Sequence, residues 1–424
     1  MNRLYGRVAA VCGACLLLAA LSGCGPFRLL FTRDGKRFVT TWAFRKNAES
    51  ILLVSLDSPQ FESIFTEIVR WGEPGHDEPA AISPDGRSIV MCRSGKKEAD
   101  SRIDFIDVRT HKRRTFARDY LSAVTFSPDG ALLGGYWHTN DVPDDWQERK
   151  MVIDEFRIYR VADGKLVSRA PLPSSGPSMP VWLPGHCVAA VCGSNLLRID
   201  GNRVETISTG LSAMEIKSTR DGKLIRTADV LNNPPRIRIL KLLVPSLKPA
   251  GKPIDIRVHV PLPDRRFLLS SLTYVTISPD GRRAALIADL TIPTYRPGWV
   301  HGYATAAYVM PIREGATPKL LEVGEVQPPK LVPKLDQRSQ DALTDHDTEI
   351  PTPNWTPDGR LAVVSGAFGN ADLVAPMNVY APDGTHRRSV PFLRSHAPAL
   401  TRLMREETRE ETKRPKQNPG TQAR

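Results

Sequence analysis

Three short clusters in the sequence contain residue types that could bind a metal ion or carry out redox chemistry. Two are histidines flanked by carboxylates, Asp345-His346-Asp347 and His76-Asp77-Glu78, and the third is a Cys-x-x-Cys spacing at Cys12 and Cys15. Imidazole and carboxylate groups bind divalent metals, and paired cysteines exchange disulfides. A solvated loop is the expected setting of the first two clusters, and the cysteines lie inside an apolar segment. The chain contains no G-x-S-x-G, phosphate-loop or H-E-x-x-H motif. We therefore expect no metal, no cofactor and no linear catalytic motif.

The first 24 residues have the three regions of an export signal in order. Arg3 and Arg7 form a positive start, an apolar stretch runs from Val8 to Leu21, and the segment ends in Leu21-Ser22-Gly23-Cys24. The apolar stretch is too short to span a bilayer comfortably. The pattern resembles a bacterial lipoprotein signal, which implies cleavage before Cys24 and acylation of its thiol. An ordinary secretory signal cleaved nearby is the alternative. We expect an exported protein, anchored by lipid at the bacterial cell envelope, on the periplasmic side or the cell surface.

Besides Cys24, three cysteines remain in the mature chain: Cys92, Cys187 and Cys192. The last two are five positions apart in one expected strand, where about 3.3 Å per residue separates them too far for a disulfide. All three are interpreted as small buried hydrophobic residues.

Asp-Gly dipeptides are the main repeated feature of the chain. They occur nine times, and six belong to longer phrases of the form [Ser/Thr]-[Pro/Arg]-Asp-Gly, found within 31–36, 82–87, 126–130, 218–223, 277–282 and 355–360. A degenerate seventh copy is Trp182-Leu-Pro-Gly185-His. Proline and glycine supply the backbone angles of a tight turn, and Ser, Thr and Asp bond nearby amides. Each phrase is therefore expected to be a hairpin turn between two apolar strands.

The three other Asp-Gly pairs, at 163–164, 200–201 and 383–384, come later in their units and are expected to form a second hairpin turn. One unit is then four antiparallel strands, and the unit recurs about every 57 residues, which predicts a β-propeller. We expect an all-β chain with a single propeller, most simply of seven four-stranded blades, and a short C-terminal helix or tail. The first unit supplies its own first strand (27–31) and the seventh its own last strand (386–393), so the ring is expected to close without exchanging a strand.

The phrase Ser-Pro-Asp-Gly-Arg followed by an apolar strand, then Ile103-Asp-Phe-Ile-Asp107, resembles the TolB-like family of propeller repeats. The resemblance covers residues 27 to 393. It implies the propeller fold and does not make the chain TolB itself, because TolB has an α/β domain before its propeller. The same repeats occur in the propellers of prolyl oligopeptidase-type peptidases, but here only about 30 residues follow the seventh unit.

The expected domains are a signal peptide at 1–23, the propeller at 24–395 and a charged helical or disordered tail at 396–424. A Pro-rich insertion at about 324–353 separates the sixth and seventh units. The formal net charge is +12. Lys and Arg are spread along the whole chain, so we expect no nucleic-acid partner.

Strand direction predicts where partners bind. The loops between the second and third strands of each unit share one face with the links between units, and they hold much of the aromatic content. Aromatic and Arg side chains dominate binding hot spots. The candidate binding residues are Trp42, Phe44, Trp137, His138, Tyr295, Arg296, Trp299 and Tyr303.

The sequence favours a non-catalytic scaffold that is tethered to the membrane through Cys24 and binds an envelope protein or a polysaccharide. The alternative is a propeller enzyme with a metal- or quinone-dependent site over the central channel.

Overall fold

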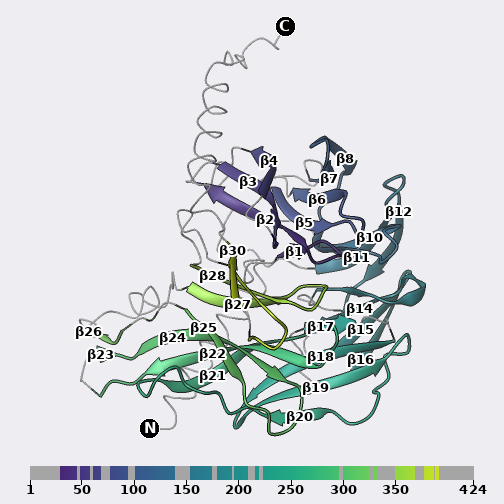
Figure 1. Cartoon of the computed structure of the whole chain (residues 1–424). Helices are drawn as coiled ribbons and strands as arrows, with labels where there is room; N and C mark the ends of the chain where they lie inside the picture. Colours follow the sequence, from purple (N-terminus) through teal and green to yellow (C-terminus); the bar gives the residue numbers. More distant parts are fainter. Residues whose placement is uncertain are drawn as a thin grey trace, which may run out of the picture.

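The computed structural model describes most of the chain between residues 29 and 390. The described ranges are 29–44, 48–57, 61–67, 77–93, 101–138, 153–173, 179–192, 195–208, 215–218, 223–295, 299–324, 326, 328–331, 349–367, 377–385 and 387–390. Their strands form seven four-stranded antiparallel sheets, the blades, and one two-stranded sheet. In Figure 1 the blades follow one another in chain order from purple to yellow, and β27, β28 and β30 lie between β2 and β22.

The strand bounds are as follows. Blade 1 contains β1 (Leu30–Phe31), β2 (Arg37–Phe44), β3 (Ala48–Ser55) and β4 (Phe61–Glu67). Blade 2 contains β5 (Asp77–Ile82), β6 (Ser88–Arg93), β7 (Arg102–Asp107) and β8 (Arg113–Ala117). Blade 3 contains β9 (Ser122–Phe126), β10 (Leu132–His138), β11 (Ile153–Arg160) and β12 (Leu166–Pro171). Blade 4 contains β13 (Val181–Trp182), β14 (Val188–Cys192), β15 (Asn195–Asp200) and β16 (Arg203–Ser208).

Blade 5 contains β17 (Glu215–Ser218), β18 (Leu224–Asn232), β19 (Pro235–Leu243) and β20 (Ile254–Arg257). Blade 6 contains β21 (Leu268–Ile277), β22 (Arg283–Ile292), β24 (Gly302–Pro311) and β25 (Lys319–Val323). Blade 7 contains β27 (Glu349–Trp355), β28 (Leu361–Ala367), β29 (Met377–Tyr380) and β30 (Arg387–Val390). The two-stranded sheet pairs β23 (Trp299–Val300) with β26 (Lys330–Leu331).

The architecture confirms the expected all-β propeller of seven four-stranded blades. Within the described ranges the one helical element is a 3-10 turn at Pro184–His186, in the degenerate seventh phrase. No helix in these ranges is long and apolar enough to cross a membrane. The signal segment, Cys24 and the tail from 396 lie outside the described residues, as do most of the Pro-rich insertion and the Asp345-His346-Asp347 cluster.

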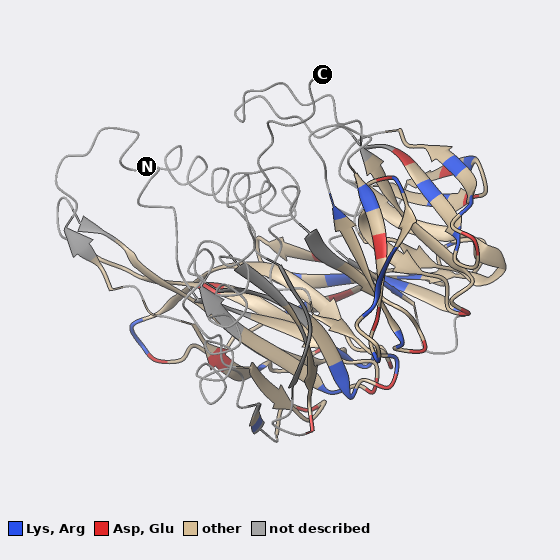
Figure 2. Cartoon of the chain, turned by 90° about the horizontal axis from the view of Figure 1, so that it is seen from above, with Lys and Arg blue, Asp and Glu red and all other residues tan. Residues whose placement is uncertain are grey.

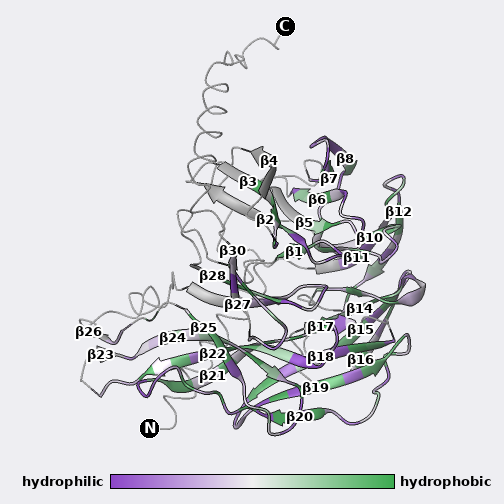
Figure 3. Ribbon diagram, in the orientation of Figure 1, coloured by the Kyte–Doolittle hydropathy of each residue, from purple (hydrophilic) through white to green (hydrophobic). Residues whose placement is uncertain are grey.

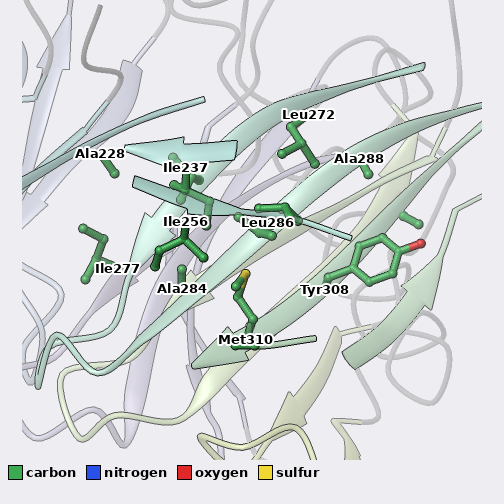
Figure 4. Packing of buried hydrophobic residues seen from close by; sticks show 14 of the residues in the cluster. Ala228, Ile237, Ile256, Leu272, Ile277, Ala284, Leu286, Ala288, Tyr308 and Met310 are labelled. Atoms are coloured by element: carbon green, nitrogen blue, oxygen red, sulfur yellow. The ribbon is translucent and has the colours of Figure 1, made fainter. Parts of the chain in front are cut away.

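The core consists of seven apolar clusters, one for each junction between neighbouring blades. Alternate residues of β22 serve two junctions, because Leu286 and Ala288 pack toward blade 5 and Ala285 packs toward blade 7. Figure 4 shows Leu286 beside Ile237 and Ile256 in the junction of blades 5 and 6. Since both faces of a blade are covered, middle strands such as β14 and β22 are almost continuously hydrophobic. Figure 3 shows green hydrophobic segments in the blades, interrupted by purple hydrophilic ones.

Five of the six Asp-Gly phrases form the expected turns, held by one hydrogen-bond pattern, whereas most of the phrase at 218–223 lies outside the described residues. In blade 2 the Ser83 hydroxyl donates to Asp85 Oδ1 (2.6 Å), the Arg87 amide donates to the same oxygen (3.0 Å), and the Ser88 amide donates to Ser83 Oγ (2.9 Å). Gly86 has φ +69°, which a side chain disfavours. Equivalent Ser or Thr to Asp bonds occur at Thr32, Ser127, Ser278 and Thr356.

The ring closes without strand exchange, as predicted. β1 pairs with β2 in blade 1, and β30 pairs with β29 in blade 7. The junction is held by an apolar cluster that includes Phe38 and Val379, and by Arg360, which donates to Asp57 Oδ1 (2.7 Å). Packing of blade faces therefore replaces the hydrogen bonds of a shared sheet.

The strand order gives the ring two different faces. The first-to-second and third-to-fourth strand turns share one face, here called the turn face. The second-to-third strand connections and the links between blades share the opposite one, the loop face. Eleven glycines with positive φ are described, and nine of them lie in Asp-Gly dipeptides or the degenerate phrase, all on the turn face.

Candidate functional site on the loop face

All of the candidate binding residues that the structure describes lie at loop-face ends of their blades. Several are in strands rather than in loops, because the strands extend further than expected. Trp42 and Phe44 are near the end of β2, Trp137 and His138 end β10, and Trp299 and Tyr303 begin or nearly begin β23 and β24; Tyr295 lies in the β22–β23 link. Arg296 lies outside the described residues.

A two-stranded ribbon joins two segments that are distant in the sequence. Trp299 of β23 pairs with Leu331 of β26, which belongs to the Pro-rich insertion between blades 6 and 7. Figure 1 shows β23 and β26 projecting beyond β22 and β24 at the left of the view. The insertion is therefore part of the same loop-face structure as the β22–β24 connection.

Tyr295 is the most exposed large hydrophobic side chain among the described residues, with 93% of its surface accessible. Its loop is tied at the base, where the Thr294 amide donates to His301 Nδ1 at 2.9 Å. Tyr303 is half-buried on β24. The loop thus exposes the Tyr295 ring to solvent, while the hydrogen bond between Thr294 and His301 holds the base of the loop.

Blade 3 holds Trp137 in a different way. The ring is half-buried against the junction of blades 2 and 3, and the Arg157 guanidinium carbon lies 3.8 Å from the ring centroid. Arg157 Nη1 donates to Asp119 Oδ2 (2.7 Å) and its Nε donates to Glu155 Oε2 (2.8 Å). The Tyr159 hydroxyl also donates to Asp119. Trp137 is consequently a fixed aromatic group in a buried polar cluster.

The cluster pairs one guanidinium with two carboxylates. Burial alone lowers the pKa of Arg157, but its hydrogen bonds with Glu155 and Asp119 outweigh burial and raise the pKa above the usual value. Burial, followed by the hydrogen bond to Asp119, also raises the pKa of Tyr159. Arg157 therefore stays a cation and Tyr159 a neutral donor at neutral pH.

Sequence reasoning found Trp137 but missed the residues that fix it. Asp119 and Arg157 are 38 positions apart, and Asp119 and Tyr159 are 40 apart. Their spacing has no local period, so only the packing of blade 2 against blade 3 brings them together. The alternation of Glu155, Arg157 and Tyr159 along β11 was the one available signal, since it places three polar side chains on one face of a strand.

Asp289 is a half-buried residue in the loop-face half of blade 6. It lies on β22, between Ser271 of β21 and Thr305 of β24. The Ser271 hydroxyl donates to Asp289 Oδ2 at 2.9 Å. Burial raises the pKa of Asp289 to about 6, against the lowering effect of the serine. A carboxyl with a raised pKa is a feature of many active sites, although structural networks also produce it.

The part of the chain that the structure describes has neither a metal-binding cluster nor a surface dominated by charges of one sign. No group of three His, Cys, Asp or Glu side chains there could hold a metal ion. Figure 2 shows blue Lys and Arg beside red Asp and Glu along the turns. Cys92, Cys187 and Cys192 are buried and are not joined by a disulfide, as expected from the sequence.

No protein-family model matches the sequence, and no curated protein matches it. Similar solved structures of low sequence identity include TolB and other β-propeller proteins. An oligogalacturonate lyase in complex with manganese is 15% identical over 81% of this chain and 89% of that chain, with a TM-score of 0.46. The β-propeller domain of the Trilobed protease from Pyrococcus furiosus, which has an open velcro topology, is 11% identical over 84% and 93%, with a TM-score of 0.46. TolB from Acinetobacter baumannii is 14% identical over 85% and 62%, with a TM-score of 0.37. These similarities concern the fold only.

Proposed function

We propose that this chain is a non-catalytic scaffold of the bacterial cell envelope, exported by residues 1–23, anchored by lipid at Cys24, and able to bind a protein or glycan partner through its loop face. The observation that carries the proposal is the clamped Trp137. One side of its ring is covered by Arg157, which is itself held by Asp119 and Glu155. An aromatic group fixed before binding loses little conformational entropy when a partner covers it.

The contrast between the faces supports the same proposal. On the turn face, carboxylates such as Asp85 are engaged in short bonds to their own turns. On the loop face, aromatic residues of blades 1, 3 and 6 stand at strand ends and in a connecting loop. Binding residues are concentrated on loops held by a rigid scaffold.

A pull-down from detergent-solubilised envelopes tests the partner. The chain, Trp137→Ala and the turn-face control Arg87→Ala are used as baits; the Arg87 side chain is 84% exposed. We expect the parent and Arg87→Ala to retain the same protein or glycan, and Trp137→Ala to lose most of it. Equal retention by all three baits, with equal melting temperatures, contradicts the assignment of this site.

The anchor is tested separately. Cys24→Ser should leave the protein unacylated and either soluble or unprocessed, whereas the parent should fractionate with membranes. Mass spectrometry of the parent should find lipid on Cys24. A parent without lipid, and a Cys24→Ser variant that fractionates like it, together overturn the anchor.

The alternative is an enzyme with a metal- or quinone-dependent site over the central channel, and Asp289 is the observation that favours it. Its carboxyl has a raised pKa and a serine partner on the innermost strand of blade 6. Divalent cations added one at a time test this alternative. A cation that binds there should raise the melting temperature of the parent and leave that of Asp289→Asn unchanged.

A further inference from the structure

Resting on the proposed lipid anchor, we propose that the loop-face edge of blade 6 is a second membrane contact, which lies in the headgroup region of an anionic bilayer. The edge is called here the blade 6 rim. It is defined by four apolar residues: Leu262, Leu268, Tyr295 and Val326.

The rim gathers most of the exposed apolar residues that the structure describes. Six large hydrophobic side chains are exposed in the described ranges, and four are those of the rim, at 38%, 53%, 93% and 40% accessibility in chain order. The other two, Val167 (43%) and Leu243 (46%), lie near third-to-fourth strand turns on the opposite face. Exposed apolar groups gathered at one edge mark a contact surface.

Strand pairing brings the rim together from three connections. Leu268 lies opposite Thr291, and Thr291 lies opposite Tyr303. Adjacent strands are about 4.8 Å apart, so this row crosses three strands in about 10 Å. Val326 follows Gly324, whose amide still bonds Thr305. Tyr295 follows the end of β22 by three residues, and Leu262 lies in the link that enters β21.

The charge around the rim favours an anionic surface. The link at 257–268 contains three arginines, Arg257, Arg265 and Arg266, and one acidic residue, Asp264. Asp264 is paired with Arg266 at 2.7 Å. Basic residues are attracted to an anionic membrane surface, and a tyrosine places its ring at the interface while its hydroxyl stays hydrated.

The length of the tether brings the loop face to the membrane. Leu30 pairs with Val39, whereas β2 continues to Phe44, so Leu29 lies about 13 Å below the loop-face end of β2. Cys24 precedes Leu29 by five residues and can lie at most about 18 Å from it. A lipid on Cys24 therefore holds the bilayer surface within about 5 Å of that end. A bilayer so close to the loop face can meet the rim.

Vesicle sedimentation of an unacylated chain tests the rim without the anchor. Residues 24–424 with Cys24→Ser retain every described blade contact, because the seven junction clusters lie between residues 29 and 380. We expect this chain to bind phosphatidylglycerol–phosphatidylcholine vesicles and to bind phosphatidylcholine vesicles more weakly. Leu268→Ser with Tyr295→Ser should weaken binding to the anionic vesicles at least tenfold. The matched control, Val167→Ser with Leu243→Ser, should bind like the parent.

Three outcomes overturn the proposal. In the first, the parent chain fails to bind anionic vesicles, and in the second, the rim variant and the control lose binding equally. The third outcome is a rim variant that binds vesicles like the parent but no longer retains a protein in the envelope pull-down. Thermal melts of both variants exclude unfolding as the cause of a loss. Failure here leaves the partner site at Trp137 and the lipid on Cys24 standing, since neither is used in the sedimentation.

Discussion

One aspartate of the turn face and one of the loop-face half of the ring are held in opposite ways. Asp85 accepts hydrogen bonds from Ser83 and the Arg87 amide, and the Ser83 bond lowers its pKa. Asp289 lies among strands with one serine donor, and burial raises its pKa to about 6. Donors stabilise the charged form and burial the neutral one. The carboxylate of Asp85 thus fixes its own turn, whereas Asp289 lies in a less satisfied setting between strands.

The largest expected effect on stability comes from breaking the buried ion pair of Asp119 and Arg157 in blade 3. Asp119→Ala removes one partner of Arg157, whose side chain is 8% exposed, and should lower the free energy of unfolding by about 3 kcal/mol. The control is Arg160→Ala, which breaks an exposed pair with Asp163 and should cost less than about 1 kcal/mol. Urea unfolding measures both. A loss from Asp119→Ala no larger than that of its control contradicts the buried role.

Asp289→Asn tests the carboxyl with the raised pKa. Between pH 4 and 6 the unfolded chain releases this proton while the folded chain keeps it, so stability falls as the pH rises through that window. A shift from 3.8 to about 6 corresponds to about 3 kcal/mol at pH 7. The variant should therefore be more stable than the parent at pH 7 by about 2–3 kcal/mol and should lack this slope. Parallel stability–pH curves for the two proteins would show that Asp289 titrates normally.

Substitution of two glycines on the turn face distinguishes the cost of backbone strain from the cost of a clash between blades. A Cβ on Gly164 (φ +70°) would lie 2.5 Å from the Phe116 carbonyl oxygen of blade 2, whereas a Cβ on Gly201 (φ +57°) would meet nothing within 4 Å. Gly201→Ala should cost about 1 kcal/mol and Gly164→Ala about 2 kcal/mol or more. Differential scanning calorimetry of the two variants gives the difference, and equal losses would mean that the blades yield to the added methyl group.

The smallest expected effect is that of Asp129. Hydrogen bonds from Ser127, the Ala131 amide and His186 lower its pKa to about 2, in that order of size. The stability it contributes is present above about pH 4 and is lost as the pH falls toward 2. The carboxyl is about half exposed, so the contribution is less than about 1 kcal/mol. Asp129→Asn should flatten acid unfolding between pH 4 and 2, and His186→Ala should do so only in part.

The sequence predicted the blades because each Asp-Gly phrase fixes its own turn through neighbours at most five residues away. Even the degenerate phrase contains a positive-φ glycine, Gly185. What it could not predict were contacts made only after blades pack, such as Asp119 with Arg157. The pairing of Trp299 with Leu331 was also missed, because neither loop shows a strand period without the other. Trp42 and Phe44 were placed in a loop since the apolar pattern does not mark where a strand ends.

The closure of the ring without a shared strand has a consequence for the order of folding. Every hairpin within a blade forms between near neighbours in the chain, but Arg360 and Asp57 are 303 residues apart. Loop-closure entropy makes such a contact the slowest to form, so we infer that blade 1 waits with Phe38 and Leu56 uncovered until blade 7 has been synthesised. A chain that stops before Val379 keeps that apolar face in water, where a second unfinished ring can cover it.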